Sequence, residues 1–279
     1  MAVRVRCITD PACVWSWAVE PAVRALMVEF GEGLEWTFVM GGLAREFGAE
    51  GLVRHWLDAA GESGMPTDPR VWFEGPIRSS YPACMAVKAA QEQGPAAGVR
   101  YLRGLREGII ALRRKLDTTE ALVEEARAAG LDSERFRIDL ASHAIVEAFG
   151  RDLEEARHVP DVVRKADRVR CSEPMGEERV PFPTFRFEGE GEHEAHWTCG
   201  FRPHAAMREA ALAAGAQPSA DPRPDVAAAL ARFGRMAVPE VAAVCAVSAP
   251  KVEATLSGLA LDWRVRPVPV GSDRLWEPV

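Results

Sequence analysis

The sequence has 279 residues, of which 48% are hydrophobic, and a formal net charge of −7. A chain of this length and apolar content can bury a sizeable core, as one large domain or two smaller ones. Its negative charge gives no general attraction to nucleic-acid phosphates, and no apolar run approaches the ~20 residues that span a bilayer. We therefore expect a globular α/β protein with neither a nucleic acid nor a membrane as partner.

The cysteine pattern bears on the cellular compartment. Six cysteines are scattered along the chain, and no two have Cys-x-x-Cys spacing; they are Cys7, Cys13, Cys84, Cys171, Cys199 and Cys245. The N-terminal residues enter a strand pattern at once, without the basic, apolar and small-residue segments of a secretory signal. Together these features predict free thiols and a cytoplasmic location.

The first forty residues have the pattern of a strand, a helix and a second strand. β-Branched residues mark a strand over residues 2–9, and apolar residues recur with helical spacing over about 13–30. Gly31 and Gly33 mark the end of that helix, and residues 34–40 form a mostly apolar strand. The pattern predicts a βαβ unit with a buried parallel pair of strands.

Cys13 falls at the junction between the first strand and the helix. The first backbone N–H groups of a helix have no intrahelical partner, and the helix dipole favours negative charge there. A thiolate at this position is stabilised relative to a thiol, so we expect Cys13 to be a reactive cysteine. Ser16 is a candidate hydrogen-bond donor to the thiolate, with a helix-capping hydroxyl as the alternative.

The rest of the chain divides into a helical block, a hairpin and a C-terminal segment. Residues 44–167 are almost entirely helical in pattern, with helices that include 119–129 and 133–149. Strand patterns over 180–187 and 195–199 flank a polar, glycine-rich turn and predict a hairpin, which a helix over 203–214 follows. His193, His196 and Cys199 do not form a metal site on one hairpin strand, so we expect no metal.

The C-terminal segment follows a proline-rich linker. Residues 216–224 lack periodicity, and the three short helices and the β-hairpin predicted beyond them look like a winged helix. In the presumed recognition helix, Lys251 is matched by Glu253, whereas a helix that reads a DNA groove needs several basic or amide side chains. We expect this module to have an accessory or protein-contact role.

Several motifs resemble known families. Residues 10–17, Asp-Pro-Ala-Cys-Val-Trp-Ser-Trp, resemble the start of a thioredoxin fold of the DsbA family, particularly its FrnE-like branch. Residues 17–21, Trp-Ala-Val-Glu-Pro, are similar to a pattern in the SpxH adaptor family, and residues 79–86 resemble a Ser-x-Pro-Ala segment of FrnE-like proteins. Phe182-Pro183-Thr184 resembles the element whose cis-proline faces the reactive cysteine. Where the DsbA family has its resolving cysteine, this chain has Ser16.

The resemblance implies a thioredoxin fold with an inserted helical domain, followed by the winged-helix-like module. Residues 1–43 and 168–215 then form the thioredoxin-like domain, and residues 44–167 form the insertion. Residues 216–224 are the linker to a module that comprises residues 225–279.

The resemblance also implies a set of site residues. The candidate catalytic residues are Cys13, Ser16 and Pro183. The candidate substrate-binding residues are Trp15, Trp17, Phe182, Thr184 and Cys84. At least one of the two tryptophans is expected in the core, and a buried helical cysteine is the favoured alternative for Cys84.

The function that follows from this resemblance is monothiol thiol–disulfide exchange. The Cys13 thiolate attacks a protein or small-molecule disulfide, Pro183 helps to hold the substrate backbone, and an external low-molecular-weight thiol releases the mixed disulfide. No bound cofactor is expected. One alternative is a non-catalytic adaptor resembling SpxH that holds a client protein. A further alternative is a glutathione-type transferase or isomerase, because kappa-class glutathione transferases share this architecture.

Overall fold

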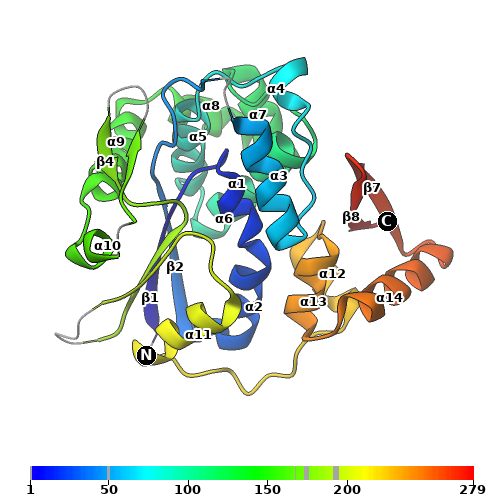
Figure 1. Ribbon diagram of the computed structural model, residues 1–279. Helices are drawn as coiled ribbons and strands as arrows, with labels where there is room; N and C mark the ends of the chain where they lie inside the picture. Colours follow the sequence, from blue (N-terminus) through cyan, green and yellow to red (C-terminus); the bar gives the residue numbers. More distant parts are fainter. Residues whose placement is uncertain (1, 49–50, 167, 173–175, 191–194) are drawn as a thin grey trace.

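A four-stranded sheet forms the centre of the computed structural model, which describes residues 2–48, 51–166, 168–172, 176–190 and 195–279 (Figure 1). The strand order is β2-β1-β5-β6, with bounds Val3–Thr9 (β1), Leu34–Met40 (β2), Thr184–Glu188 (β5) and His196–Cys199 (β6). β1 pairs with β2 in parallel and with β5 antiparallel, and β5 pairs antiparallel with β6. The predicted βαβ unit and the later hairpin are therefore both present.

The segment expected as one helix over 13–30 is two helices, α1 (Val14–Ala18) and α2 (Glu20–Phe30). Pro21 stands in the first turn of α2. Proline has no N–H to donate to the carbonyl four residues earlier, and its ring crowds that carbonyl, so the helix breaks just before it. The short turn η1 (Gly31–Gly33) leads from α2 into β2, and α11 (His204–Ala213) packs against α2.

Helices make up most of the segment between β2 and β3. They are α3 (Leu52–Ser63), α4 (Val71–Glu74), α5 (Tyr81–Gln91), α6 (Pro95–Arg106), η2 (Glu107–Ala111), α7 (Thr119–Ala128), α8 (Ser133–Leu140), α9 (His143–Arg157) and α10 (Asp161–Lys165). The helix predicted over 133–149 is divided into α8 and α9. The hydroxyl of Ser142 accepts a hydrogen bond from the N–H of Ile145 and so starts a new helix.

A short hairpin precedes β5 and was not predicted from the sequence. Its strands are β3 (Arg170–Ser172) and β4 (Glu177–Arg179), which pair antiparallel. The strand predicted from residue 180 begins only at Thr184, because Pro181 and Pro183 have no N–H for a sheet ladder. The polar turn predicted after this strand lies partly outside the described residues.

The C-terminal elements are three helices and a hairpin, in the order expected. They are α12 (Val226–Phe233), α13 (Val238–Cys245), α14 (Ala249–Leu261), β7 (Val265–Val270) and β8 (Asp273–Pro278). They share a hydrophobic cluster that includes Leu230, Val241 and Leu256, and they lie together on one side of the molecule (Figure 1). Their identity as a winged helix remains a prediction.

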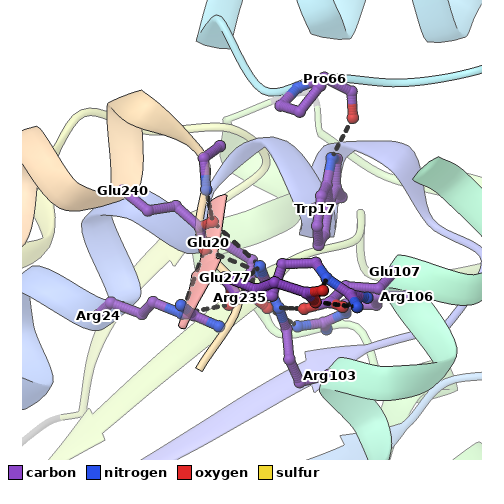
Figure 2. Close-up of polar contacts among 11 residues, drawn as sticks. Trp17, Glu20, Arg24, Pro66, Arg103, Arg106, Glu107, Arg235, Glu240 and Glu277 are labelled. Carbon is purple, nitrogen blue, oxygen red and sulfur yellow. Dashed lines mark hydrogen bonds and ion pairs between the residues drawn. The ribbon is translucent and has the colours of Figure 1, made fainter. Parts of the chain in front are cut away.

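Ion pairs in the interior connect this C-terminal module to α2 and α6 (Figure 2). Glu240 on α13 is fully buried and pairs with Arg24 of α2 and Arg103 of α6. Glu20 of α2 pairs with Arg24, Arg103 and Arg106. Although burial opposes ionisation, these positive charges hold the pKa of Glu20 below its ordinary value.

Among the described residues, no single helix is long and apolar enough to span a membrane. The pair α13 and α14, bent by 109°, passes the same test of length and composition only when the two helices are joined.

Candidate functional site

Cys13 lies at the predicted position between β1 and the first helix, as the N-cap residue of α1. Its backbone is extended, and its carbonyl accepts hydrogen bonds from the N–H groups of Ser16 (3.0 Å) and Trp17 (3.1 Å). The turn from β1 is closed by the N–H of Cys13, which donates to the carbonyl of Asp10 (3.2 Å). The strand-to-helix junction of the predicted site is thus present.

The thiol itself is not the stabilised thiolate that the sequence predicted. The Cys13 side chain is 5% exposed, and its Sγ lies 3.7 Å from the carbonyl oxygen of Phe182. Burial raises the pKa of Cys13; the neighbouring Ser16 acts in the opposite direction, and the nearby Asp10 raises the pKa further. Burial is the largest influence on the pKa of this thiol, and it opposes the stabilised thiolate that the helix start predicts.

Ser16 is a buried polar neighbour of Cys13. Its Oγ accepts a hydrogen bond from the hydroxyl of Thr9 (2.8 Å), and Thr9 in turn accepts one from Arg106 (2.5 Å). Ser16 lies inside α1 and does not cap it, which argues against the capping alternative, and its hydrogen bond to the Cys13 sulfur stays a prediction. The side chain has an oxygen where a resolving sulfur would be required for dithiol chemistry.

The segment opposite Cys13 contains the expected cis-proline. The Phe182–Pro183 peptide bond is cis, and the carbonyl of Pro183 accepts a hydrogen bond from Gly200 (2.7 Å). Thr184, which was predicted to bind substrate, is fully buried, and its hydroxyl donates to the carbonyl of Pro181 (2.6 Å). Thr184 therefore contributes to the interior of this turn and is not available to a substrate.

Cys84 also differs from its predicted substrate-binding role. Its side chain is fully buried, and its Sγ donates to the carboxylate of Asp10 at 3.2 Å. The same carboxylate accepts hydrogen bonds from the N–H groups of Ala12 and Leu43 and from the hydroxyl of Ser80. Burial, followed by the charge of Asp10, raises the pKa of Cys84 well above its ordinary value. This geometry favours the buried helical cysteine over a substrate-binding residue.

Trp17 is a core residue and does not form a substrate-facing platform. Its side chain has no exposed surface, and its indole N–H donates to the carbonyl of Pro66 at 2.9 Å (Figure 2). The guanidinium of Arg103 lies over the ring, 4.3 Å from its centre. Trp17 therefore packs between the segment that follows α3 and helix α6.

A cleft of 620 Å³ opens beside Cys13, and it defines the candidate site. Of the predicted residues, Cys13, Trp15 and Phe182 line it. The indole N–H of Trp15 points at Nε2 of His55 (2.7 Å), and its ring lies 5.7 Å from that of Phe201. His55 and Phe201, which also line the cleft, were not singled out by sequence reasoning.

Three arginines on the wall of this cleft were also missed: Arg168, Arg170 and Arg179. Arg170 and Arg179 face each other across the β3–β4 hairpin, and the Arg179 guanidinium lies 4.2 Å from the centre of the Phe182 ring. Among the residues that the structure describes, the lining has one carboxylate, that of Glu62. The excess of positive charge makes the cleft attractive to an anionic group.

The donor sets of metal sites are groups of His, Cys, Asp or Glu side chains that converge on one ion. No group of three or more His, Cys, Asp or Glu side chains within the described ranges could hold a metal ion. Of the three residues considered as ligands from the sequence, His193 lies outside those ranges.

The sheet, the cis-proline turn and the helices between β2 and β3 define a thioredoxin fold. The family model described as thioredoxin matches residues 7–161. The ClpXP adapter protein SpxH of Halalkalibacterium halodurans is 31% identical over 280 residues, covering 96% of this chain and 86% of that protein. The chain therefore belongs to the thioredoxin family, in the group that includes the SpxH proteins.

Two further similarities have a narrower scope. The ClpXP adapter protein SpxH of Bacillus subtilis is 32% identical over 153 residues, covering 53% of this chain and 51% of that protein. The cytosolic disulfide reductase DsbM from Pseudomonas aeruginosa, whose structure has also been solved with GSH, superimposes with a TM-score of 0.55 at 18% identity. That superposition covers 75% of this chain and 98% of DsbM, and it shows a shared fold.

Proposed function

We propose that this protein is an adapter that binds a protein client, as a ClpXP adapter of the SpxH kind, and that it does not catalyse thiol–disulfide exchange. The observation that carries this proposal is the burial of the Cys13 thiol, which is 5% exposed and has a raised pKa. The thiolate is the attacking species in disulfide exchange. A buried thiol with Ser16 in the position of the resolving cysteine is poorly suited to turnover.

The cleft beside Cys13 is the proposed client-binding surface. Trp15 and Phe201 offer aromatic surface, and Arg170 and Arg179 offer fixed positive charge. Aromatic and arginine side chains are the residue types that contribute most to protein–protein binding energy. A client segment with acidic and apolar side chains would match this lining.

Photo-crosslinking from the cleft tests the adapter proposal. A photoreactive residue at Leu52, which lines the cleft, is expected to capture one client in the source cells. Capture should persist in Cys13→Ser, because binding does not require the thiol. With the purified client, Arg170→Glu should weaken binding about tenfold, which corresponds to about 1.4 kcal/mol.

The matched control is Arg151→Glu, which changes an exposed arginine of α9 outside the cleft lining and should leave the affinity unchanged. The same client should then be tested for ClpXP-dependent turnover with and without this protein. Loss of capture in Cys13→Ser, or release of the client by a reducing agent, would instead indicate a covalent mixed disulfide.

A second candidate is monothiol exchange with an anionic low-molecular-weight thiol of the glutathione type. The arginines beside Cys13 favour it, because they match the carboxylates of such a thiol. The Cys13 thiolate would attack a disulfide, form a mixed disulfide and release one thiolate. The external thiolate would then attack the mixed disulfide, restore the Cys13 thiolate and leave as a new disulfide.

The Ser16→Cys variant tests whether thiol–disulfide exchange is absent because Cys13 is buried or because a second thiol is missing. The wild type is expected to reduce insulin no faster than Cys13→Ser. Because Cys13 stays buried in this variant, Ser16→Cys should reduce insulin no faster than Cys13→Ser, whereas a rise of about tenfold would show that only the second thiol is missing. Ser16→Ala is the matched control. Wild-type turnover that requires added glutathione and disappears in Cys13→Ser would favour the second candidate.

A further inference from the structure

A second and larger cavity lies between α2, α6, α7 and the C-terminal module. Its volume is 1260 Å³, and it shares no lining residue with the cleft beside Cys13. Apolar side chains from separate elements line it, including Val23 and Met27 of α2, Phe38 of β2, Leu102 of α6 and Phe233 of α12. A concave apolar surface of this kind is typical of a small-molecule site.

The charges on the lining are unequal in number. Seven lining residues are arginines and four are glutamates. Arg103 and Arg235 are matched, because both pair with Glu107 and each pairs with a further glutamate of the network (Figure 2). Arg232 is exposed and forms no ion pair with any residue that the structure describes. Glu240, which is not on the lining, neutralises part of this charge through Arg24 and Arg103, but among the described residues Arg232 keeps a positive charge for a ligand.

Two of these arginines, one on α2 and one on α12, lie close to the same aromatic ring. The guanidinium carbons of Arg24 and Arg232 are each 5.1 Å from the centre of the Phe233 ring. Arg24 is 5% exposed, and its Nη1 has no hydrogen-bond partner among the described residues. Buried donors in native proteins are normally paired, so this nitrogen requires an acceptor. An anionic oxygen near Phe233 would supply one.

We propose that this cavity binds an amphipathic carboxylate, with its charged head beside Arg24 and Arg232 and its hydrocarbon chain along Val23, Met27 and Leu102. A hydrocarbon chain brings no polar group into the apolar part of the cavity. A peptide would bring backbone N–H and C=O groups that these side chains cannot pair, and burying them unpaired is unfavourable. The lining therefore favours a small amphipathic molecule.

Direct binding to the full chain tests this site, with decanoate as the probe and decan-1-ol as its uncharged counterpart. Decanoate, below its micelle concentration, is expected to bind in a calorimetric titration at least about tenfold more tightly than decan-1-ol, because only the carboxylate pairs with the arginines. It should also raise the unfolding temperature, since the bound molecule contacts both α2 and the C-terminal module.

Charge-reversal variants locate the binding. Arg232→Glu should weaken decanoate binding at least about tenfold and leave decan-1-ol binding unchanged. Arg151→Glu is the matched control and should bind decanoate as the wild type does, as should Trp15→Ala, which alters the other cleft. The inference is overturned if decanoate does not bind, if decan-1-ol binds equally well, if Arg232→Glu has no effect, or if Trp15→Ala abolishes binding.

Discussion

Brief alkylation of the folded protein at neutral pH is expected to modify Cys171 about a hundredfold or more faster than Cys13. Cys171 lies exposed on β3, whereas Cys13 is 5% exposed. Burial also raises the pKa of Cys13, and each unit of increase lowers the thiolate fraction about tenfold at a pH below the pKa. The reduced access of the reagent to Cys13 and the reduced ionisation of its thiol both slow its alkylation. Mass-spectrometric mapping after short exposure to iodoacetamide measures both rates.

The pH dependence gives an independent readout of the same burial. Because the folded pKa of Cys13 is raised, its alkylation should keep accelerating at alkaline pH after an unperturbed model thiol has reached its limiting rate. Unfolded protein in denaturant is the control, and there the two cysteines should react at similar rates. If Cys13 is modified first in the folded protein, the thiol is activated and the adapter proposal loses its main support.

The position of Cys13 could be predicted from the sequence, but its environment could not. A β-branched run followed by helical spacing places a residue at a helix start, and this depends only on local pattern. Exposure depends on what packs over the site, and here the Phe182 carbonyl from a segment far along the chain covers the sulfur. The same limit explains Trp17, because its partners Pro66, between α3 and α4, and Arg103, on α6, lie far from it in the sequence.

The arginines of the cleft were missed for a different reason. Arg170 and Arg179 belong to strands of three residues each, too short and polar to give an alternating pattern. Their pairing across the hairpin brings both to the Cys13 cleft, although the sequence separates them from Cys13 by more than 150 residues. The C-terminal helices, by contrast, were predicted because proline and glycine residues mark their ends.

How the C-terminal module is held in place could not be predicted from local pattern at all. Glu20, Arg103 and Glu240 lie on three helices far apart in sequence, and each would ordinarily be assigned to a solvated face. Their convergence is visible only in the folded protein (Figure 2). A glutamate with no exposed surface is costly unless it is paired, so Glu240 is the residue at which this connection is best tested.

Glu240→Ala is expected to lower the free energy of unfolding by about 3–5 kcal/mol. Glu240 pairs with Arg24 at 3.2 Å and Arg103 at 2.8 Å, and it accepts a hydrogen bond from the N–H of Ala237 at 2.7 Å. Removing it leaves buried positive charge uncompensated and the start of α13 uncapped. Urea denaturation measures the loss of stability, and hydrogen exchange should show α12 and α13 opening more readily than β1.

Two further variants test whether the charge of Glu240, rather than its packing, stabilises the protein. Glu240→Gln keeps an acceptor for Ala237 but removes the negative charge, so its loss of stability should be smaller than that of Glu240→Ala. Glu253→Ala changes an exposed glutamate of α14 that forms no ion pair within the described ranges, and it should alter stability by no more than about 0.5 kcal/mol. A loss for Glu240→Ala as small as that for Glu253→Ala, with unchanged exchange in α13, would show that the ion pairs do not hold the C-terminal module against α2 and α6.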